Sequence, residues 1–346
     1  MQALVKRTEG PGMSLDAVPV PEIGPADVLI RVQKTGICGT DYHIYSWDTW
    51  ARNRVRPPFT VGHEFMGVIE KIGGMVERLR VGDRVSGEGH IGCGHCYFCR
   101  TGQGHICRDV QIIGVDSDGC FAEFLSLPAG NVWKLKPEIS SDVAAILDPI
   151  GNAMHTVTAQ NIAGRAVAVI GAGAIGLIAV QIARSAGALS VIAIEPQEHK
   201  RTLALQFGAA AAFDPTSGAE WQRQYCALTP TGMGADVVLE MSGSAKGIRN
   251  AFELARPGAD VALLGIPSKE VQLDLSEGVI FKGLVVRGIN GRLMFETWYQ
   301  SERFLVEKKI EVLPIITHRV HYRDYLDAFA LLERGEAVKI LLEWEN

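Results

Sequence analysis

The chain has 346 residues with a formal net charge of −5, and charged residues make up 21% of it. This length predicts two domains, at roughly 150 residues per domain, and without a lysine- and arginine-rich block we expect no nucleic-acid partner. The N-terminus lacks the apolar core of a signal peptide, and the most apolar run, 166–180, is shorter than the ~20 residues of a membrane span. We therefore expect a cytoplasmic protein without a membrane partner, whose seven cysteines are thiols or metal ligands.

Short strand-like runs separated by Gly, Pro and Asp fill about the first 145 residues, and they predict an all-β, barrel-like region; examples are 27–36, 66–73 and 82–89. Within it the stretch TGICGTDYH places Cys38 between Gly36 and Gly39. This stretch alone favours a buried thiol, because free cysteine is among the most buried residue types. The alternative is a metal ligand, to which the two glycines would give room.

GHEFMG, residues 62–67, offers His63 and Glu64 just before a strand, although such a pair is more often a capped turn. Asp148, ahead of Pro149, offers a further carboxylate. Together with Cys38 these side chains would bind Zn²⁺ through soft and borderline ligands and leave a position open for a substrate oxygen.

Four cysteines lie close together between residues 93 and 107, with two, two and seven residues between neighbours: Cys93, Cys96, Cys99 and Cys107. This spacing predicts a tetrahedral zinc site, and four protein ligands leave no open position, so the metal would be structural. An iron–sulfur cluster is the alternative, but the loop is flanked by strands and no partner cluster is indicated. A zinc ribbon that binds nucleic acid would need a basic face, and none accompanies the loop.

From residue 166 onward, apolar strand patterns alternate with helix patterns. This alternation predicts an α/β region with a parallel sheet covered on both faces. The expected strands are 166–171, 191–195, 235–243, 260–268 and 284–291, and the expected helices are 174–187 and 198–208.

GAGAIG, residues 171–176, follows the first of these strands and opens a helix. In this context Gly171 allows a tight turn, Gly173 lets a pyrophosphate approach the backbone, and Gly176 lets the helix press on the sheet. Glu195 ends the next strand, where it would bind the adenosine ribose and repel a 2′-phosphate, so NAD is favoured over NADP. Lys200 and Arg201 either contact the adenosine end or form a solvated helix face.

The last 50 residues or so predict a helix over 294–309 and a strand over 338–345. GHEFMG, the four-cysteine loop, the glycine-rich turn and the chain length resemble zinc-dependent medium-chain dehydrogenases, over essentially the whole chain. Longer strings, such as KTGICGTDYHIYSWDTW and VIFKGLVVRGINGRLMFETWY, resemble one branch of that family still more closely.

The resemblance implies a discontinuous GroES-like β-barrel catalytic domain, residues 1–150 and 292–346, with an inserted doubly wound Rossmann domain, residues 151–291. It also implies NAD, two zinc ions per chain, one catalytic and one structural, and a homotetramer joined through the Rossmann sheet edge. The catalytic-zinc motif falls on Cys38, His63 and Glu64. Asp148 would act from outside the ligand shell or bind the metal directly.

Thr40 and His43 match the family's proton relay, with the cofactor ribose between them. The resemblance also implies a set of cofactor contacts: Ile175, Leu264, Gly265, Ile266, Ile289 and Asn290. His90 either faces the substrate or is a loop histidine. We expect Asp41 to be structural and Trp47, Trp50 and Trp298 to be packing residues.

The branch-level resemblance implies oxidation of the 3-hydroxyl of L-threonine, with hydride transfer to NAD⁺ and 2-amino-3-oxobutanoate as product. The alternative is a zinc-dependent polyol or diol dehydrogenase, of the sorbitol or butanediol type, which would share every metal and cofactor residue. A non-catalytic relative would have lost Cys38, His63 or Glu64, and all three are present.

Overall fold

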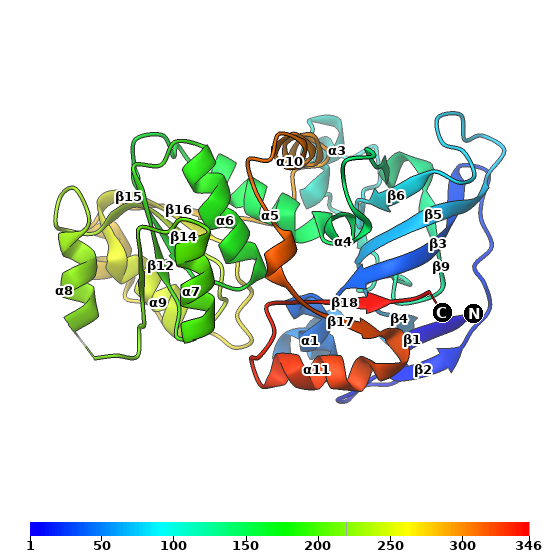
Figure 1. The fold of residues 1–346 in the computed structure, drawn as a ribbon, viewed down its shortest axis with the longest axis horizontal. Coiled ribbons are helices and arrows are strands. Elements are labelled where there is room, and N and C mark those ends of the chain that lie inside the picture. The colour runs from blue at the N-terminus through cyan, green and yellow to red at the C-terminus, as the bar shows by residue number, and fades with distance from the viewer. Residues whose placement is uncertain (219, 346) are drawn as a thin grey trace. The chain divides into compact units, whose positions relative to one another are not determined.

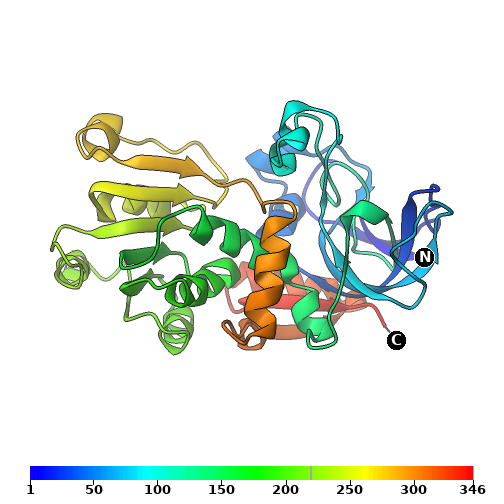
Figure 2. The same cartoon turned by 90° about the horizontal axis from the view of Figure 1, so that it is seen from above.

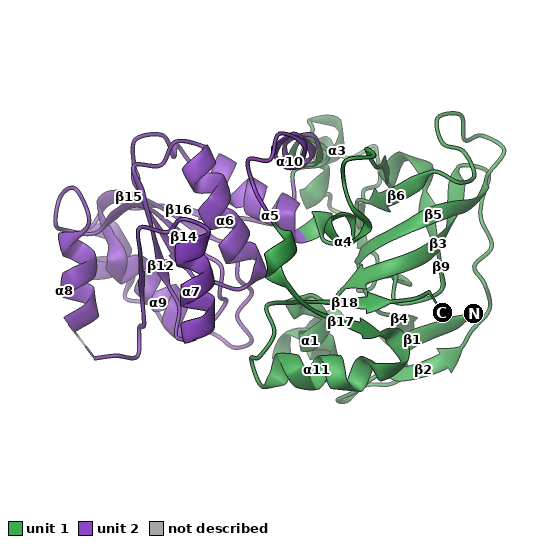
Figure 3. Cartoon of the chain, viewed as in Figure 1, with its two compact units in different colours: residues 1–148, 293–298, 312–346 green, residues 149–292, 299–311 purple. Residues whose placement is uncertain are grey.

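The computed structural model describes residues 1–218 and 220–345. The chain forms two compact units, one of residues 1–148, 293–298 and 312–346 and one of residues 149–292 and 299–311 (Figure 3). The sequence-based division placed all of 292–346 with the first unit, whereas 299–311 packs with the second. The reason lies in two hydrogen bonds: Gln181 Nε2 donates to the Glu311 carbonyl at 2.9 Å, and Ser185 Oγ donates to that of Lys309 at 2.9 Å.

The first unit is built mainly from short strands (Figure 1). Its strands are β1 (Gln2–Lys6), β2 (Ser14–Ala17), β3 (Asp27–Gly36), β4 (Phe59–Thr60), β5 (Glu64–Ile72), β6 (Arg84–Gly87), β7 (His90–Ile91), β8 (Gln111–Ile112), β9 (Phe124–Pro128), β10 (Val132–Lys134), β17 (Ile316–His321) and β18 (Lys339–Glu343). Its helices are α1 (Gly39–Ser46), α2 (Thr49–Arg54), α3 (Tyr97–Arg100), α4 (Ser141–Ala144) and α11 (Tyr325–Glu333), with 3₁₀ turns η1 (Gly104–Ile106), η2 (Ala129–Asn131), η4 (Leu313–Ile315) and η5 (Tyr322–Asp324).

The main sheet of this unit has the order β10-β6-β5-β3-β18-β17, with β9 also paired to β3, and a smaller sheet has the order β2-β1-β4. The C-terminal strand β18 pairs with β3, with Leu342 opposite Thr35, so strands more than 300 residues apart in sequence share one sheet (Figure 1). The expected GroES-like barrel is confirmed.

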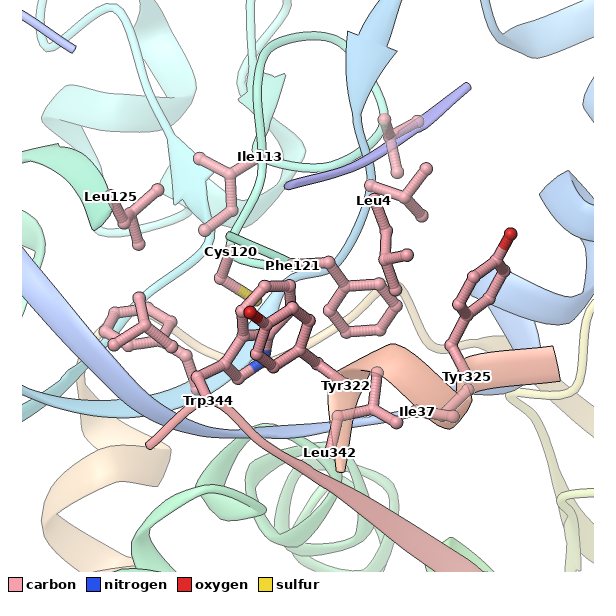
Figure 4. Packing of buried hydrophobic residues seen from close by; sticks show 14 of the residues in the cluster. Leu4, Ile37, Ile113, Cys120, Phe121, Leu125, Tyr322, Tyr325, Leu342 and Trp344 are labelled. Atoms are coloured by element: carbon pink, nitrogen blue, oxygen red, sulfur yellow. The ribbon is translucent and has the colours of Figure 1, made fainter. Parts of the chain in front are cut away.

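Aromatic side chains from both ends of the chain fill the core of the first unit. Tyr322 and Trp344 stack with ring centroids 4.5 Å apart, and Phe121 and Cys120 lie beside them (Figure 4). Trp344 Nε1 donates to Thr35 Oγ1 at 2.9 Å, so its one polar atom is satisfied inside the core. Burial of such large rings supplies much of the hydrophobic stabilisation of a β-rich unit.

The two longest helices in the region expected to be all β are α1 and α2. Cys38 is the N-cap of α1, and its N–H donates to the Asp41 carboxylate at 2.8 Å. Asp48 caps α2 by accepting from the Ala51 N–H at 3.0 Å. Such caps satisfy the free N–H groups of a helix start. The sequence pattern missed α1 because Asp41 and Ile44 alone among its residues are buried, which leaves no apolar periodicity to detect.

The second unit is a parallel sheet with helices packed against it. Its elements are α5 (Leu147–Thr158), which starts at the junction of the units, β11 (Ala166–Ile170), α6 (Ala174–Ser185), β12 (Ser190–Ile194), α7 (Glu198–Gln206), β13 (Ala211–Phe213), α8 (Glu220–Ala227), β14 (Ala235–Glu240), α9 (Ala245–Leu254), β15 (Ala255–Leu263), the π-helical turn η3 (Ser276–Ile280), β16 (Val285–Gly288) and α10 (Glu296–Val306). Figure 1 shows α6 and α7 side by side over the sheet, and these two helices are in contact.

The strand order is β13-β12-β11-β14-β15-β16, and every neighbouring pair is parallel. This is the doubly wound order 3-2-1-4-5-6, in which the connections change direction between the first and fourth strands. The expected Rossmann sheet is confirmed, and ligands of such sheets bind at the carboxyl ends of the strands. Among the described residues, no helix combines the length and apolar character needed to cross a bilayer.

Asp236 joins the two central strands of this sheet. Its carboxylate accepts from the Ala166 N–H at 2.8 Å and from Arg256 Nε at 2.7 Å. Burial by itself raises the pKa of Asp236, but these hydrogen bonds outweigh burial and the pKa is lowered. The lowered pKa contributes stability that is present above the unfolded-state pKa and is lost as the pH falls through the folded-state pKa.

We therefore expect Asp236→Asn to lower the free energy of unfolding at pH 7 by about 1–3 kcal/mol. The difference from wild type should narrow below about pH 5, because the wild-type carboxyl becomes neutral as well. Urea unfolding at a series of pH values measures both effects. Asp274→Asn is the control, since the exposed Asp274 caps only the Glu277 N–H. A difference that stayed constant with pH would show that the charge of Asp236 is unimportant.

Candidate metal and nucleotide sites

Three side chains named from the sequence come together in the first unit. The ligand atoms of Cys38, His63 and Glu64 all lie within 4.8 Å of one another. The β3–β5 ladder sets Gly36 opposite Glu64, and a Cβ on Gly36 would come within 2.1 Å of Glu64 Oε2. The space above Gly36 is therefore filled by the carboxylate. A Cβ on Gly39 would meet nothing within 4 Å, so only one of the two glycines makes room for the cluster.

The turn that presents His63 is fixed by Gly62 and Phe121. Gly62 has a φ of +95°, and a Cβ there would lie 2.2 Å from the Phe121 ring. Phe121 is fully buried in the core shown in Figure 4. A residue with a side chain would have to displace that ring and adopt a left-handed backbone as well. The Gly-His-Glu sequence thus places His63 on a turn held by the core.

Asp41 does more than stabilise the start of α1. Its Oδ1 lies 3.5 Å from His63 Nδ1, while Oδ2 accepts from the Cys38 N–H. Burial by itself lowers the pKa of His63, but the negative charges of Asp41 and Cys38 outweigh it and hold the pKa well above its usual range. A carboxylate at one ring nitrogen of a metal-binding histidine orients the other nitrogen toward the metal. The sequence analysis took Asp41 as structural and did not foresee this contact.

Glu64 is paired with Lys339 of the C-terminal strand. Lys339 Nζ lies 2.7 Å from Oε1 and 2.6 Å from Oε2, and it also donates to the Ile37 carbonyl at 2.9 Å. Burial raises the pKa of Glu64, Lys339 lowers it and the charge of Asp148 raises it, with a net upward direction. Asp148 is thus near enough to act on Glu64, although it is not one of the three residues in the 4.8 Å cluster.

The donor set of this cluster fits a zinc ion. It combines a thiolate, an imidazole and a carboxylate, which are the three ligand types that Zn²⁺ accepts. Three protein ligands would leave a fourth position open, as in catalytic rather than structural zinc sites. The burial of His63 and Glu64 also keeps bulk water from these donors.

The predicted relay residues stand on the helix that Cys38 begins. Thr40 Oγ1 lies 3.8 Å from Cys38 Sγ, and His43, three residues further along α1, shares a helix face with Thr40. His43 Nδ1 lies 2.5 Å from Asp48 Oδ2, and its ring centroid lies 5.7 Å from that of Trp50. Trp50, expected only to pack, therefore packs against the relay histidine.

A buried carboxylate, Glu88, holds His90. Glu88 Oε1 lies 2.9 Å from both the His90 N–H and His90 Nδ1, and Oε2 accepts from Trp298 Nε1 at 2.8 Å. Trp298 also packs on Trp133, with ring centroids 5.5 Å apart. Trp298 was expected to be a packing residue, and it is also a hydrogen-bond donor to a fully buried acid. The acid in GEGHIG was the available signal for Glu88, and the sequence analysis did not use it.

The four loop cysteines, Cys93, Cys96, Cys99 and Cys107, also have their sulfur atoms within 4.8 Å of one another. They lie in a separate lobe of the first unit that carries α3 and η1 (Figure 2). The N–H groups of Cys93 and Asp109 each donate to Cys107 Sγ at 3.3 Å. Backbone hydrogen bonds, that of Cys99 first, lower the pKa of Cys96 to about 6. Sulfurs that accept backbone N–H groups are suited to the thiolate form that zinc requires.

Replacing the most buried of the four sulfurs should release a metal ion. We expect Cys107→Ser to lose bound zinc and to expose residues 93–107 to proteases, because the lobe has little core of its own. Metal analysis and limited proteolysis measure the two effects. Cys226→Ser is the matched control, since Cys226 belongs to neither cysteine cluster of the described residues. Unchanged zinc content in Cys107→Ser would remove Cys107 from the ligand set.

The glycine-rich turn lies at the carboxyl end of β11. Gly171 has a φ of +88°, and a Cβ on Gly176 would lie 1.9 Å from the Gly171 carbonyl oxygen. A Cβ on Gly173, the N-cap of α6, would meet nothing within 4 Å. The turn thus keeps open space at the N-terminus of a 12-residue helix, which is where a pyrophosphate gains from free N–H groups and the helix dipole. Ile175 lies half-buried in the first turn of that helix.

Glu195 follows β12 and is bonded to the same turn. Its carboxylate accepts from the Ala172 N–H at 2.8 Å and from the Gln197 N–H at 3.0 Å. Burial lowers the pKa of Lys200, and the charge of Glu195 partly offsets this. Arg201 is not a freely solvated residue, since its Nη1 donates to the Glu195 carbonyl at 2.9 Å and that of Pro196 at 2.6 Å.

The remaining predicted cofactor residues follow β15 and β16 at the same edge of the sheet. Leu264, Gly265 and Ile266 come directly after β15, and Ile289 and Asn290 directly after β16. A further acid at this edge, Glu240 at the end of β14, lies between β11 and β15 and was not foreseen from the sequence. It is fully buried, burial raises its pKa, and its Oε1 accepts from the N–H groups of Ser242 at 2.9 Å and Gly243 at 3.1 Å. An acid at the end of an otherwise apolar strand was the available signal.

A Cys-His-Glu cluster in which the histidine and the glutamate are buried, and a doubly wound sheet with an open glycine-rich turn, define a metal- and nucleotide-dependent oxidoreductase. Residues 24–137 match the family described as the alcohol dehydrogenase GroES-like domain, and residues 174–307 match the one described as zinc-binding dehydrogenase. An L-threonine 3-dehydrogenase of Bacillus licheniformis is 44% identical over 342 residues, which cover 99% of this chain and 98% of that one. The chain belongs to the family of zinc-binding dehydrogenases with a GroES-like domain.

Solved structures of similar proteins cover the whole chain. A protein of Sinorhizobium meliloti 1021 described as a zinc-binding dehydrogenase, bound to NADP, has a TM-score of 0.89 and 31% identity and covers 99% of this chain and 98% of its own. Galactitol-1-phosphate dehydrogenase from Escherichia coli has a TM-score of 0.89 and 29% identity, with 99% and 100% covered.

Proposed function

We propose that this protein is a cytoplasmic, zinc-dependent L-threonine 3-dehydrogenase that uses NAD⁺. The Cys38–His63–Glu64 cluster, together with the open glycine-rich turn, supports the proposal of zinc-assisted alcohol oxidation. The substrate rests on the full-length similarity to a protein named L-threonine 3-dehydrogenase. A reducing compartment suits the four thiols of the structural metal site, and we count two zinc ions per chain.

When bound, zinc supplies a Lewis acid that makes a hydroxyl more acidic, and NAD⁺ accepts the hydride released by the substrate carbon. Asp41 orients His63 for metal binding, and Lys339 balances the charge of Glu64. Thr40 Oγ1 takes up the hydroxyl proton and passes its own proton onward, and His43 is the final acceptor. An imidazole suits that task because its ordinary pKa is about 6.5. Asp148 acts on this site through its charge on Glu64.

A polyol or diol dehydrogenase is the competing proposal, favoured by the similarity to a galactitol-1-phosphate dehydrogenase. His90 bears on the choice, because a histidine held by a buried carboxylate can bind the carboxylate or amino group of an amino-acid substrate. A polyol has neither group. The two proposals therefore differ in whether the substrate offers His90 a carboxylate or amino group to bind.

We expect NADH to form with L-threonine at a higher kcat/KM than with a panel of polyols, diols and other hydroxy amino acids. Cys38→Ser should reduce turnover to near background without unfolding the protein, because the cluster loses its thiolate. NADH absorbance measures turnover and circular dichroism checks the fold, with Cys226→Ser as the control. Faster turnover of a polyol would replace the substrate proposal, and an active Cys38→Ser variant would reject the metal role of Cys38.

Glu195 should set the preference for NAD over NADP. We expect Glu195→Gln to lower the ratio of kcat/KM for NAD⁺ to that for NADP⁺, because the variant no longer repels a 2′-phosphate. Glutamine keeps an oxygen that can accept from the Ala172 N–H and loses only the acceptor for the Gln197 N–H, so the contact to the glycine-rich turn is preserved. Steady-state kinetics with both cofactors measure the ratio. If the ratio stays at the wild-type value, Glu195 acts on the turn alone.

We also infer that the chain forms a homotetramer, with pairing through the edge strand β16. All four residues of β16 are exposed, Val285 and Val286 among them, and the segment just before the strand also exposes Leu275, Ile280 and Phe281. Phe281 is 76% exposed. An edge strand with unpaired backbone groups and a wide apolar surface is a template for pairing with a second chain.

We expect light scattering to give a mass about four times the 37.5 kDa of one chain. Val286→Lys should lower that mass, because a charge on the edge strand opposes pairing. Val20→Lys is the control, since Val20 is exposed at a similar level on the first unit. A wild-type protein that ran as a monomer would reject the proposal.

A further inference from the structure

His43 is held by a carboxylate that the sequence analysis did not single out. Asp48 Oδ2 lies 2.5 Å from His43 Nδ1, while Asp48 Oδ1 accepts from the Ala51 N–H at 3.0 Å and caps α2. The two oxygens thus have different partners, one in the relay and one in a helix cap. The His43 and Asp48 side chains are only 22% and 20% exposed.

The backbone between the two residues is built to bring them together. Trp47 adopts a left-handed conformation, with φ at +56°, which is rare for a bulky residue. It is kept there by packing, since its ring is 6% exposed and lies under Lys6 Nζ, 4.7 Å from the ring centroid. This turn reverses the chain after α1 and returns Asp48 to the side of His43.

An ionised carboxylate can only accept hydrogen bonds, and a neutral imidazole carries one N–H and one lone pair. The contact with Asp48 therefore requires the proton of neutral His43 to sit on Nδ1. The lone pair is then on Nε2, which is the state that a terminal proton acceptor needs. Uptake of a proton at Nε2 converts the imidazole to imidazolium, Nδ1–H stays bonded to Asp48, and the net charge of the pair changes from −1 to 0.

We propose that Asp48 is a positioning residue of the proton relay, which holds His43 in the Nδ1–H tautomer so that Nε2 accepts the proton. The inference rests on the proposed role of His43 and deepens it. The same division of labour is known from the serine-protease triad, where a buried aspartate fixes the tautomer of the histidine and does not itself take the proton.

The Asp48→Asn variant should change the tautomer of His43 while it keeps the N-cap of α2. The asparagine oxygen can still accept from the Ala51 N–H, because asparagine is as good an N-cap as aspartate. Its NH₂ group then faces His43 Nδ1 and donates to it, which favours the Nε2–H tautomer. Asp48→Ser is the second variant, since serine keeps a cap but is too short to fix either tautomer.

The first readout is spectroscopic and needs no turnover. Long-range ¹H–¹⁵N spectra of the zinc-loaded protein, at about pH 9 where an ordinary imidazole is neutral, report which ring nitrogen carries the proton. The His43 signals are those that disappear in His43→Gln. We expect Nδ1–H in wild type, Nε2–H in Asp48→Asn and a mixture in Asp48→Ser. A wild-type Nε2–H tautomer, or an unchanged tautomer in Asp48→Asn, would overturn the proposal.

The second readout is turnover of L-threonine and NAD⁺. We expect kcat of Asp48→Asn to fall on the order of a hundredfold, with the KM for NAD⁺ nearly unchanged, and kcat of Asp48→Ser to fall less. Asp27→Asn is the control, because the Asp27 side chain accepts from the Gly24 N–H at 3.0 Å and so, like Asp48, bonds a nearby backbone N–H. Full activity in Asp48→Asn, with the tautomer changed, would overturn the positioning role.

An error in the proposed function can be told apart from an error in the positioning role of Asp48. If His43→Gln turned over L-threonine as fast as wild type, the relay would be wrong and the positioning role would fall with it. If wild type oxidised another alcohol instead, the same kinetic comparison would be made with that alcohol. The spectra test the Asp48 contact in either case.

Discussion

The ion pair between Glu64 and Lys339 is the interaction on which the first unit depends. Both side chains are almost completely buried, and burying two charges costs several kcal/mol unless each is closely paired. The pairing is possible only because β18 joins the sheet beside β3, which in turn carries β5 and Glu64. The strand order of the barrel therefore also determines which cation balances the charge of Glu64. Removing either partner would leave an uncompensated charge beside the cluster.

The second unit follows a different constraint, the common direction of its strands. Because all six strands are parallel, the segments after β11, β12, β14, β15 and β16 emerge at one edge. Two buried acids shape that edge, Glu195 under the glycine-rich turn and Glu240 under the following loop. Each carboxylate accepts hydrogen bonds from backbone N–H groups of a loop, and these bonds hold the loop in place of a regular strand or helix ladder. The nucleotide site is thus organised by carboxylates as much as by glycines.

Strong periodicity explains what could be predicted from the sequence. The parallel sheet and its helices follow from apolar strands and glycine-ended helices, and the four-cysteine spacing leaves few alternatives. Helices α1 and α2 escaped prediction because they are held by Asp41 and Asp48, and not by an apolar stripe. Lys339 escaped because it lies 275 residues from Glu64, and no local pattern records such a contact. Asp48 and Glu88 lie close in sequence to their histidines, but local spacing alone does not show which acid contacts a histidine. The roles of the individual site residues remain predictions.

The position of β18 in the barrel also bears on how the protein is made. The ribosome delivers Cys38, His63 and Glu64 early, but Lys339 arrives only with the last strand. The contiguous part of the second unit, residues 149–292, is complete before that point and can fold while synthesis continues. The ion pair between Glu64 and Lys339 in the first unit can form only once β18 has been made, because Lys339 belongs to that strand. The charge of Glu64 is thereby balanced later in synthesis than the parallel sheet of the second unit is completed.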